Sequence, residues 1–365
     1  MRDFSGIKKI VIKVGTNTLS GPDGIDVFYI EELASQINDI RKHGFIPLLV
    51  SSGAIGMGSR ELGIKHKVKK IDMRQALAAI GQPVLMHTYR QAFLRYDIPV
   101  AQILLTRDTF DNRKAYVNLK NAVDSLLHMG ALPVFNENDC ISTDEIGTAF
   151  GDNDTLSAYI ASKTDADLLI LLTDIDGLYT DDPKKDKNAR IIRTVIEISD
   201  EMLNKAGGAG STHSTGGMKT KLMAARIAGQ AGCRVVIAHG REKNILPRIL
   251  AGEEIGTLFL PSGRLKNRER WILQAQPHGN IVVDDGAFRA VGKKKSLLPS
   301  GVLRVEGSFE AGDVITINGT IKAVSALSSK DIEKVAGRHT SELVAILGKD
   351  KPDVVVRADD IVIEK

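Results

Sequence analysis

The chain has 365 residues, of which 43% are hydrophobic and 26% are charged, and its formal net charge at pH 7 is +4. This composition is close to that of an average folded globular protein and excludes general disorder, while the length predicts two domains. Because the net charge is small for this length, it does not indicate nucleic-acid binding by the chain as a whole.

The number of cysteines and the lengths of the apolar segments predict the cellular compartment. Cys140 and Cys233 are too few for a disulfide framework or a cysteine-based zinc site. The N-terminal sequence MRDFSG lacks the apolar segment and cleavage site of a signal peptide, and no apolar run approaches the ~20 residues that span a bilayer. We therefore expect a reduced, soluble, cytoplasmic protein that does not contact a membrane.

The first part of the chain alternates between apolar strands and amphipathic helices. Residues 7–14 (IKKIVIKV) predict a strand, and apolar residues three and four apart after Asp26 predict a helix that ends near Gly44. The further predicted strands are residues 45–50, 99–106, 131–139, 167–174 and 233–240, and the further helices lie near 73–96, 115–128, after Asn153 and at 218–231. This alternation indicates a parallel sheet covered on both faces, which binds its ligands at the carboxyl ends of the strands.

The pattern changes near Pro261. Residues 262–270 are basic and polar, and the short alternating segments that follow predict a small, mostly β domain. We place the first domain at residues 1–261, a linker at 262–277 and the second domain at 278–365. The part from Ser262 onward holds 17 Lys and Arg against 14 Asp and Glu, an excess too small to establish an RNA partner. The lysine run 293–295 fits a solvated surface, and RNA contact is the alternative.

Candidate functional residues lie at the predicted strand ends. Lys13 is followed by Gly15, which would let the backbone approach an anion while the lysine supplies a point charge. A solvated lysine is the simpler interpretation of that pair alone. The turn at residues 51–56 (SSGAIG) has no large side chains, so its N–H groups suit a carboxylate or a phosphate, with a close-packed turn as the alternative.

Amides, acids and glycines gather at three further places. Residues 136–139 (NEND) and 151–154 (GDND) carry more polar groups than helix capping requires and could hold a polar substrate. No His or Cys cluster accompanies them, so we do not expect a dedicated metal cage. Residues 173–180 (TDIDGLYT) follow a strand, and residues 215–221 (TGGMKTK) open a helix that could bind phosphate, unless they form only a flexible glycine loop.

Several common nucleotide-binding signatures are absent from the sequence. There is no Walker motif, no G-x-G-x-x-G, and no HRD and DFG pair. This disfavours P-loop enzymes, Rossmann dehydrogenases and protein kinases.

The motifs KVGT, SSGAI, NEND, GDND, TDIDGLYT and TGGMKTK, in this order over residues 7 to about 260, resemble the amino acid kinase family. The tail sequence, from VDDGA to GDVITI, resembles a PUA domain, a small β-barrel met in RNA-modifying enzymes. The resemblance implies an α/β fold with a three-layer, open, mostly parallel sheet, followed by a small mostly-β PUA barrel. With this tail, the chain resembles the family members that use ATP to phosphorylate the side-chain carboxylate of L-glutamate, the first step of proline biosynthesis.

The resemblance also implies a role for each site residue. Lys13 and Lys221 would stabilise the transition state of phosphoryl transfer, and Asp154 would orient both lysines. The residues that would hold glutamate are Ser52, Gly53, Ala54, Asn136, Asp139 and Asn153. The residues that would contact ATP are Lys13, Thr173, Asp174, Thr215, Gly216, Gly217, Met218, Lys219, Thr220 and Lys221. Mg²⁺ would be bound mainly by the nucleotide phosphates and water, so no metal ligand is expected from the protein.

The chemistry of the acceptor and the partners follow from the same resemblance. A glutamate carboxylate, with an ordinary pKa of about 4.3, is ionised at neutral pH and needs no general base, so positioning and electrostatics would carry the reaction. The family implies a homo-oligomer (dimer or tetramer), proline as a feedback inhibitor and a functional association with a γ-glutamyl phosphate reductase. The alternative is an RNA-binding protein in which the kinase fold is only a scaffold, against which stands the full set of charged strand-end residues.

Overall fold

The computed structural model describes residues 1–21, 24–66, 68–141, 153–183, 185–206 and 217–363. The chain divides into two compact units, Met1–Arg264 and Leu265–Lys365. The helix α11 (Asn267–Gln274) lies within the segment that we expected to be a linker, and it packs against strands of the second unit. Among the described helices, none has both the length and the apolar character that crossing a bilayer requires.

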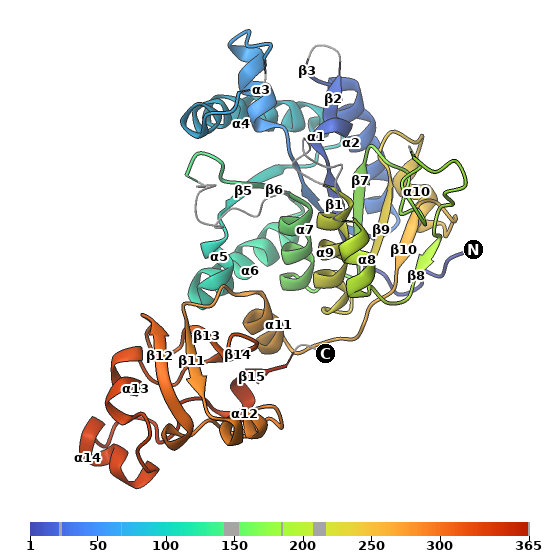
Figure 1. The fold of residues 1–365 in the computed structure, drawn as a ribbon. Coiled ribbons are helices and arrows are strands. Elements are labelled where there is room, and N and C mark those ends of the chain that lie inside the picture. Colours follow the sequence, from blue (N-terminus) through green and yellow to red (C-terminus); the bar gives the residue numbers. More distant parts are fainter. Residues whose placement is uncertain (22–23, 67, 142–152, 184, 207–216, 364–365) are drawn as a thin grey trace. The chain divides into compact units, whose positions relative to one another are not determined.

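The first unit is built on one large sheet (Figure 1). Its strands, in spatial order, are β5 (Val100–Leu105), β6 (Leu132–Glu137), β4 (Ile46–Val50), β1 (Lys9–Val14), β7 (Leu168–Thr173), β9 (Arg234–His239), β10 (Thr257–Phe259) and β8 (Thr194–Val195). The strands from β5 to β9 are parallel, and β10 runs antiparallel to β9. The predicted mostly parallel α/β sheet is confirmed.

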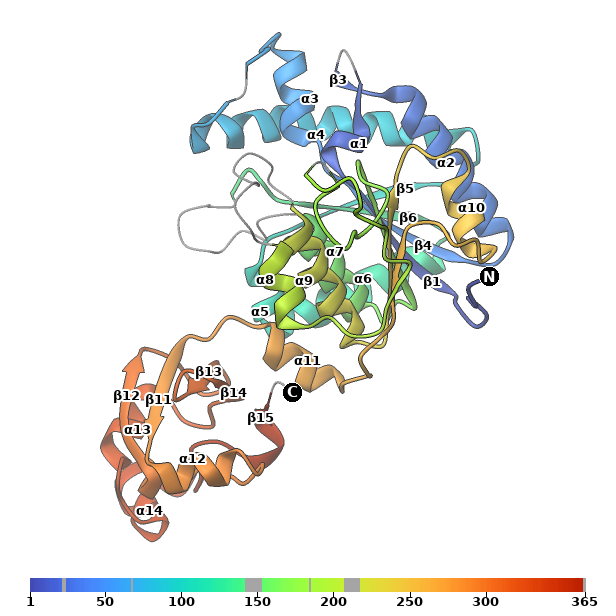
Figure 2. The same cartoon turned by 45° about the vertical axis from the view of Figure 1, so that its right-hand side comes forward.

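Helices cover both faces of this sheet, as Figures 1 and 2 show. The helices α2 (Val27–Lys42), α4 (Ile71–Leu94) and α10 (Ile245–Leu250) contribute to the apolar core on one face, which we call the α4 side. The helices α6 (Arg113–His128), α7 (Asn153–Lys163) and α9 (Met218–Gly229) contribute to the core on the other face, the α7 side. The shorter elements of this unit are α1 (Thr16–Leu19), β2 (Ser20–Gly21), β3 (Gly24–Ile25), α3 (Ala54–Glu61), α5 (Asp108–Asp111) and α8 (Asp200–Ala206).

The pleat of the strands decides which face each strand-end side chain occupies. In β1, Ile10, Ile12 and Val14 belong to the core of the α4 side, whereas Val11 belongs to that of the α7 side. Lys13, two residues after Val11, therefore points to the side of α7 and α9. By the same alternation Asn136, two residues after Val134 of the α4-side core, faces α4.

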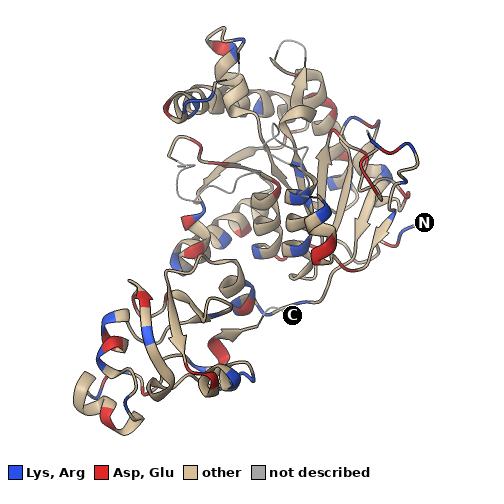
Figure 3. Cartoon of the chain, viewed as in Figure 1, with Lys and Arg blue, Asp and Glu red and all other residues tan. Residues whose placement is uncertain are grey.

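The second unit has its own sheet and its own core. The strands, in spatial order, are β12 (Val302–Gly307), β11 (Gly279–Val283), β13 (Val314–Ile317), β14 (Ile321–Val324) and β15 (Ile361–Val362), and the short helices are α12 (Asp285–Val291), α13 (Ser329–Val335) and α14 (Leu343–Leu347). Ile281, Ile315 and Ile332 are fully buried in its core. Acidic and basic residues are interspersed along this unit in the view of Figure 3, as its nearly balanced composition predicts.

Candidate active site

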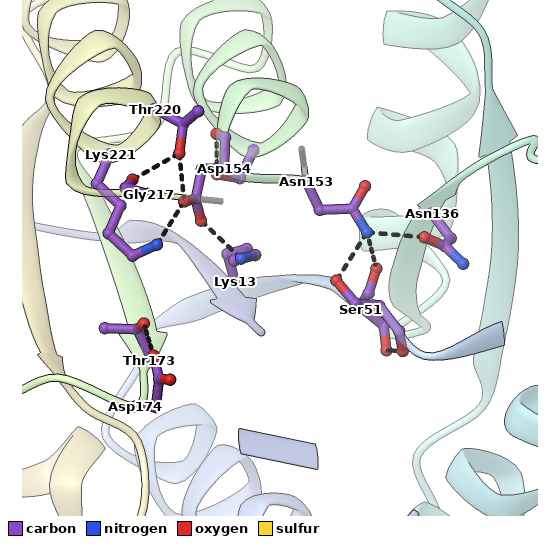
Figure 4. A network of polar contacts seen from close by, with 12 residues as sticks. Lys13, Ser51, Asn136, Asn153, Asp154, Thr173, Asp174, Gly217, Thr220 and Lys221 are labelled. Atoms are coloured by element: carbon purple, nitrogen blue, oxygen red, sulfur yellow. Dashed lines mark hydrogen bonds and ion pairs between the residues drawn. The ribbon is translucent and has the colours of Figure 1, made fainter. Parts of the chain in front are cut away.

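Two buried lysines share one buried carboxylate at the carboxyl ends of the central strands (Figure 4). Lys13 Nζ lies 2.6 Å from Asp154 Oδ1, and Lys221 Nζ lies 2.9 Å from Asp154 Oδ2. The side chains of Lys13 and Lys221 are 5% and 6% exposed, and that of Asp154 is fully buried. The three charges leave a net charge of +1 in a place shielded from water, where an anionic group gains most from electrostatic attraction.

Each member of this triad comes from a different element. Lys13 lies near the end of β1, Asp154 in the first turn of α7, and Lys221 in the first turn of α9. The helix α9 begins after Gly217, whose carbonyl oxygen accepts a 2.8 Å hydrogen bond from Thr220 Oγ1. The same hydroxyl lies 3.4 Å from Asp154 Oδ2, so the start of α9 is tied to the start of α7. The exposed N–H groups of this helix end add a positive field to the two ammonium groups.

A second cluster surrounds Asn153. Its Nδ2 lies 2.7 Å from the carbonyl oxygen of Ser51, 2.8 Å from Ser52 Oγ and 3.0 Å from Asn136 Oδ1. The two N–H groups are shared among these three acceptors, which fixes the orientation of the carboxamide. Figure 4 shows its oxygen pointing away from the three acceptors. The strand ends of β4 and β6 are thus joined to α7 by a cluster of neutral polar groups.

The turn after β4 requires glycine at Gly53. This residue has a φ of 101° at the N-cap of α3, a backbone conformation that residues other than glycine rarely adopt. A Cβ at this position would also lie 2.9 Å from Ile25 Cδ1. Directly after Ser52, this turn therefore places the partly buried Gly53 and then Ala54, which is 2% exposed.

The ends of β1 and β7 meet on the other side of Lys13. Asn17 Nδ2 donates to Asp174 Oδ2 at 2.8 Å, and Thr173 Oγ1 donates to Asp174 Oδ1 at 3.0 Å. Partial burial opposes ionisation of Asp174, but these hydrogen bonds and the charge of Lys221 outweigh it and lower the pKa of the carboxyl below its ordinary 3.8. The carboxylate therefore stays ionised at neutral pH and binds the short helix α1 to the end of β7.

One arginine after β9 secures the segment that follows β1. Arg241 Nη1 contacts Asp26 Oδ2 at 2.9 Å, and Nη2 donates to the carbonyl oxygens of Thr18 at 3.0 Å and Ser20 at 2.7 Å. Its guanidinium also lies over the ring of Tyr29, 5.5 Å from the ring centroid. This fork fixes the backbone between β1 and α2 from a residue more than 200 positions later in the sequence.

The structure brings most of the predicted site residues together. Those joined by the contacts above are Lys13, Ser52, Asn136, Asn153, Asp154, Thr173, Asp174, Gly217, Thr220 and Lys221. Met218 instead packs against the core of the α7 side, and the side chain of Lys219 is exposed. Asp139 is partly buried in the turn after β6. Thr215 and Gly216 lie outside the described residues.

Three polar residues of this region were missed by the sequence analysis. Gln82 and Tyr89 of α4 contact Asn136 and Ser51, and Asn17 contacts Asp174. Gln82 carried a weak signal, because it is polar, falls within a predicted amphipathic helix and precedes Pro83. The signal for Asn17 was its position directly after KVGT.

Comparison with known proteins decides the family. The sequence model of the amino acid kinase family matches residues 8–239. The chain belongs to the amino acid kinase family. The PUA domain model matches residues 279–347, so this family member carries a C-terminal PUA domain, as the sequence predicted.

Curated relatives match this amino acid kinase over nearly its full length. Glutamate 5-kinase of Methanococcoides burtonii is 46% identical and the match covers 97% of this chain and 96% of the relative. Glutamate 5-kinases of Methanosarcina acetivorans and Geobacter sulfurreducens are 44% and 43% identical, with matches covering 98% and 99% of this chain and 96% and 98% of the relatives. Among solved structures, UMP kinase from Bacillus anthracis matches at a TM-score of 0.48 and 17% identity, over 71% of this chain and 98% of that chain.

Proposed function

We propose that this chain transfers the γ-phosphoryl group of ATP to the side-chain carboxylate of L-glutamate, as a glutamate 5-kinase, and so starts proline biosynthesis. The products are L-glutamyl 5-phosphate and ADP. Full-length relatives of that name support the choice of substrate. The observation that carries the proposal is the position of Asp154, which holds two buried lysines directly beside the amide cluster of Asn153.

The two clusters suit the two reactants. Neutral amides and hydroxyls both donate and accept hydrogen bonds without adding net charge. Those around Asn153 therefore match the amino and carboxyl groups of an amino acid. The lysine pair and the start of α9 match the phosphate chain of ATP. The predicted ATP contacts Thr215 and Gly216 precede that helix, and Met218 and Lys219 belong to its first turn.

Magnesium fits this arrangement as an ion carried by the nucleotide. Among the described residues, no group of three or more His, Cys, Asp or Glu side chains is placed to bind a metal. Mg²⁺ usually keeps several waters and is held by substrate phosphates, and it would supply further neutralisation of phosphate charge when bound. We therefore assign it no protein ligand and derive no step from it.

In this proposal the chemical step depends on charge and alignment. An ionised carboxylate oxygen of glutamate attacks the γ-phosphorus, and the bond from that phosphorus to the bridging oxygen of ADP breaks. No proton has to be removed from the nucleophile, so no general base is required. Lys13 and Lys221 offset the negative charge that would otherwise keep two anions apart, and Asp154 holds both ammonium groups in place.

A hydroxamate assay tests the function. The protein is incubated with ATP, magnesium and hydroxylamine, and with glutamate, aspartate or N-acetylglutamate as the acceptor. We expect hydroxamate from glutamate and little from the other two. A protein that forms none, or that prefers another acceptor, would defeat the proposal. An inert protein that binds structured RNA tightly would favour the scaffold alternative.

The remaining partners and the location are part of the same proposal. The product, an acyl phosphate, is labile, which favours handing it directly to a γ-glutamyl phosphate reductase. Proline as a feedback inhibitor, a homo-oligomeric state and a cytoplasmic location follow from the same assignment. Titrating the active enzyme with proline and measuring its mass in solution test the first two. For the second unit we propose no ligand, since its charge excess is small.

A further inference from the structure

Helix α4 places two buried polar side chains under the amide cluster. Gln82 is 6% exposed and Tyr89 is fully buried, in a helix whose other buried residues are apolar or glycine. The two are seven residues apart, which is close to two helical turns, so they share one face of α4. Buried polar groups in such a position carry a desolvation cost unless their hydrogen bonds are made.

Gln82 contacts one of the acceptors of Asn153. Asn136 Nδ2 donates to Gln82 Oε1 at 2.8 Å, and Gln82 Nε2 donates to Gln102 Oε1 at 3.1 Å. Asn136 Oδ1 is then turned toward Asn153 Nδ2, and it also accepts from the backbone N–H of Glu137 at 3.0 Å. Donors and acceptors alternate in one direction along this series of amides, from Asn153 to Gln102.

Tyr89 contacts the residue that supplies another acceptor. Its hydroxyl lies 2.8 Å from Ser51 Oγ, and the backbone carbonyl of Ser51 is bonded to Asn153 Nδ2. Burial raises the pKa of Tyr89 above its ordinary value, so the phenol remains protonated and can donate. Both contacts from α4 therefore converge, through one intermediate residue each, on the same nitrogen of Asn153.

We propose that Gln82 and Tyr89 are positioning residues for the amino-acid substrate, which fix the carboxamide of Asn153 by holding its acceptors on β6 and at the end of β4. This inference rests on the proposed function, because Asn153 is there a substrate contact. Neither α4 residue has to touch the substrate. They act by holding Asn136 Oδ1 and the Ser51 carbonyl oxygen in place as acceptors for Asn153 Nδ2.

The loss of Gln82 would weaken one of these acceptors. With an apolar side chain at this position, Asn136 Nδ2 would face a buried place without an acceptor, which is unfavourable. Rotating the Asn136 amide would not help, because its oxygen would then lack a donor and its N–H groups would face Asn153 Nδ2 and the backbone N–H of Glu137. We expect the Asn136 side chain to shift instead, so that Asn153 loses one of its three acceptors and its carboxamide no longer keeps one position toward the substrate.

The test separates substrate binding from nucleotide binding. In the hydroxamate assay with the full chain, Gln82→Met is expected to raise the KM for glutamate by about tenfold and to leave the KM for ATP within about twofold. Gln82→Glu, which restores an acceptor for Asn136, should recover part of the loss, and Tyr89→Phe should raise the KM for glutamate by about threefold. Thr88→Ala is the matched control, because among the described residues that hydroxyl bonds only the Val84 carbonyl of its own helix, at 3.0 Å.

Three results would overturn the inference. They are an unchanged KM for glutamate in Gln82→Met and Tyr89→Phe, equal changes in the KM for both substrates, or no recovery in Gln82→Glu. Should Gln82→Met not fold, Tyr89→Phe decides the matter by the change in its KM for glutamate relative to its KM for ATP. A wild-type protein without hydroxamate formation would instead refute the proposed function. Glutamate affinity of wild type and variants, measured by calorimetry, would then still test whether α4 positions Asn153 for amino-acid binding.

Discussion

Asn153 and Asp154 are consecutive residues at the start of α7, and their side chains bind opposite halves of the site. Asn153 contacts the strand ends of β4 and β6, while Asp154 contacts Lys13 and Lys221. Side chains of successive residues in a helix point about 100° apart. The two neighbouring side chains therefore reach different parts of the site. The spacing between the amides around Asn153 and the lysine pair is therefore set within one helical turn.

Removing either lysine of the triad should abolish most turnover. We expect Lys13→Met and Lys221→Met to lower kcat by at least about 100-fold, since each removes a charge aimed at the transferring group. Hydroxamate formation at saturating substrates measures this. Lys9→Met at the amino end of β1 and Arg226→Met on the exposed side of α9 are the controls. Near-normal kcat in both lysine variants would contradict the assigned role.

Asp154 should matter for stability as well as for activity. In Asp154→Asn, two buried ammonium groups lose their counter-charge, and we expect the free energy of unfolding to fall by about 3–5 kcal/mol. Urea denaturation measures it. If the cost arises from uncompensated charge, adding Lys13→Met to Asp154→Asn should destabilise by less than the sum of the two single changes. Additive effects would show that the charges are not coupled.

The carboxyl of Asp174 should make stability depend on pH in the acid range. Its pKa is lowered in the folded protein, so its contribution is fully present above the ordinary value of 3.8 and is lost as pH falls through the lower folded value. The stability difference between wild type and Asp174→Asn, measured by urea denaturation, should therefore be constant near neutral pH and shrink between about pH 5 and pH 3. A difference that stays constant over this range would show that Asp174 does not titrate with folding.

The contact between α3 and α4 should tolerate no side chain at Gly81. A Cβ there would lie 1.8 Å from the carbonyl oxygen of Ala54 and 2.3 Å from the backbone nitrogen of Gly58. We expect Gly81→Ala to destabilise by about 1–3 kcal/mol or more and to raise the KM for glutamate, since Ala54 belongs to the turn after β4 that we propose as a glutamate contact. Gly56→Ala is the matched control in α3, because a Cβ at Gly56 meets nothing within 4 Å, and it should stabilise by about 0.5–1 kcal/mol.

The fold was largely predictable because its signals are local. A few residues are enough to recognise an apolar strand such as Leu168–Thr173 or a helix with regular apolar spacing such as Val27–Lys42. The antiparallel pairing of β10 was not predicted, because three residues, Thr257–Phe259, carry no directional information. The helix α11 was hidden in a basic segment, since its buried residues include Arg270 and Gln274 rather than an apolar stripe.

For the site, motif order predicted which strand-end and helix-end groups gather there, but not the α4 residues that contact them. Lys13, Asp154 and Lys221 belong to recognisable sequence motifs at strand and helix ends. Gln82 and Tyr89 lie in the middle of a helix, where only the three-dimensional register of α4 against β6 and β4 reveals their partners. Such long-range pairings leave no mark on the spacing of a single sequence.

The central position of β1 also bears on how the chain is made. This strand precedes every other described strand in the chain, yet it pairs on one side with β4 and on the other with β7 (Leu168–Thr173). A nascent chain therefore holds an apolar strand with one unsatisfied edge until β7 has been synthesised, and such edges recruit other strands. Fragments that end before β7 are expected to collect in the insoluble fraction, whereas chains that extend past β9 can close the sheet.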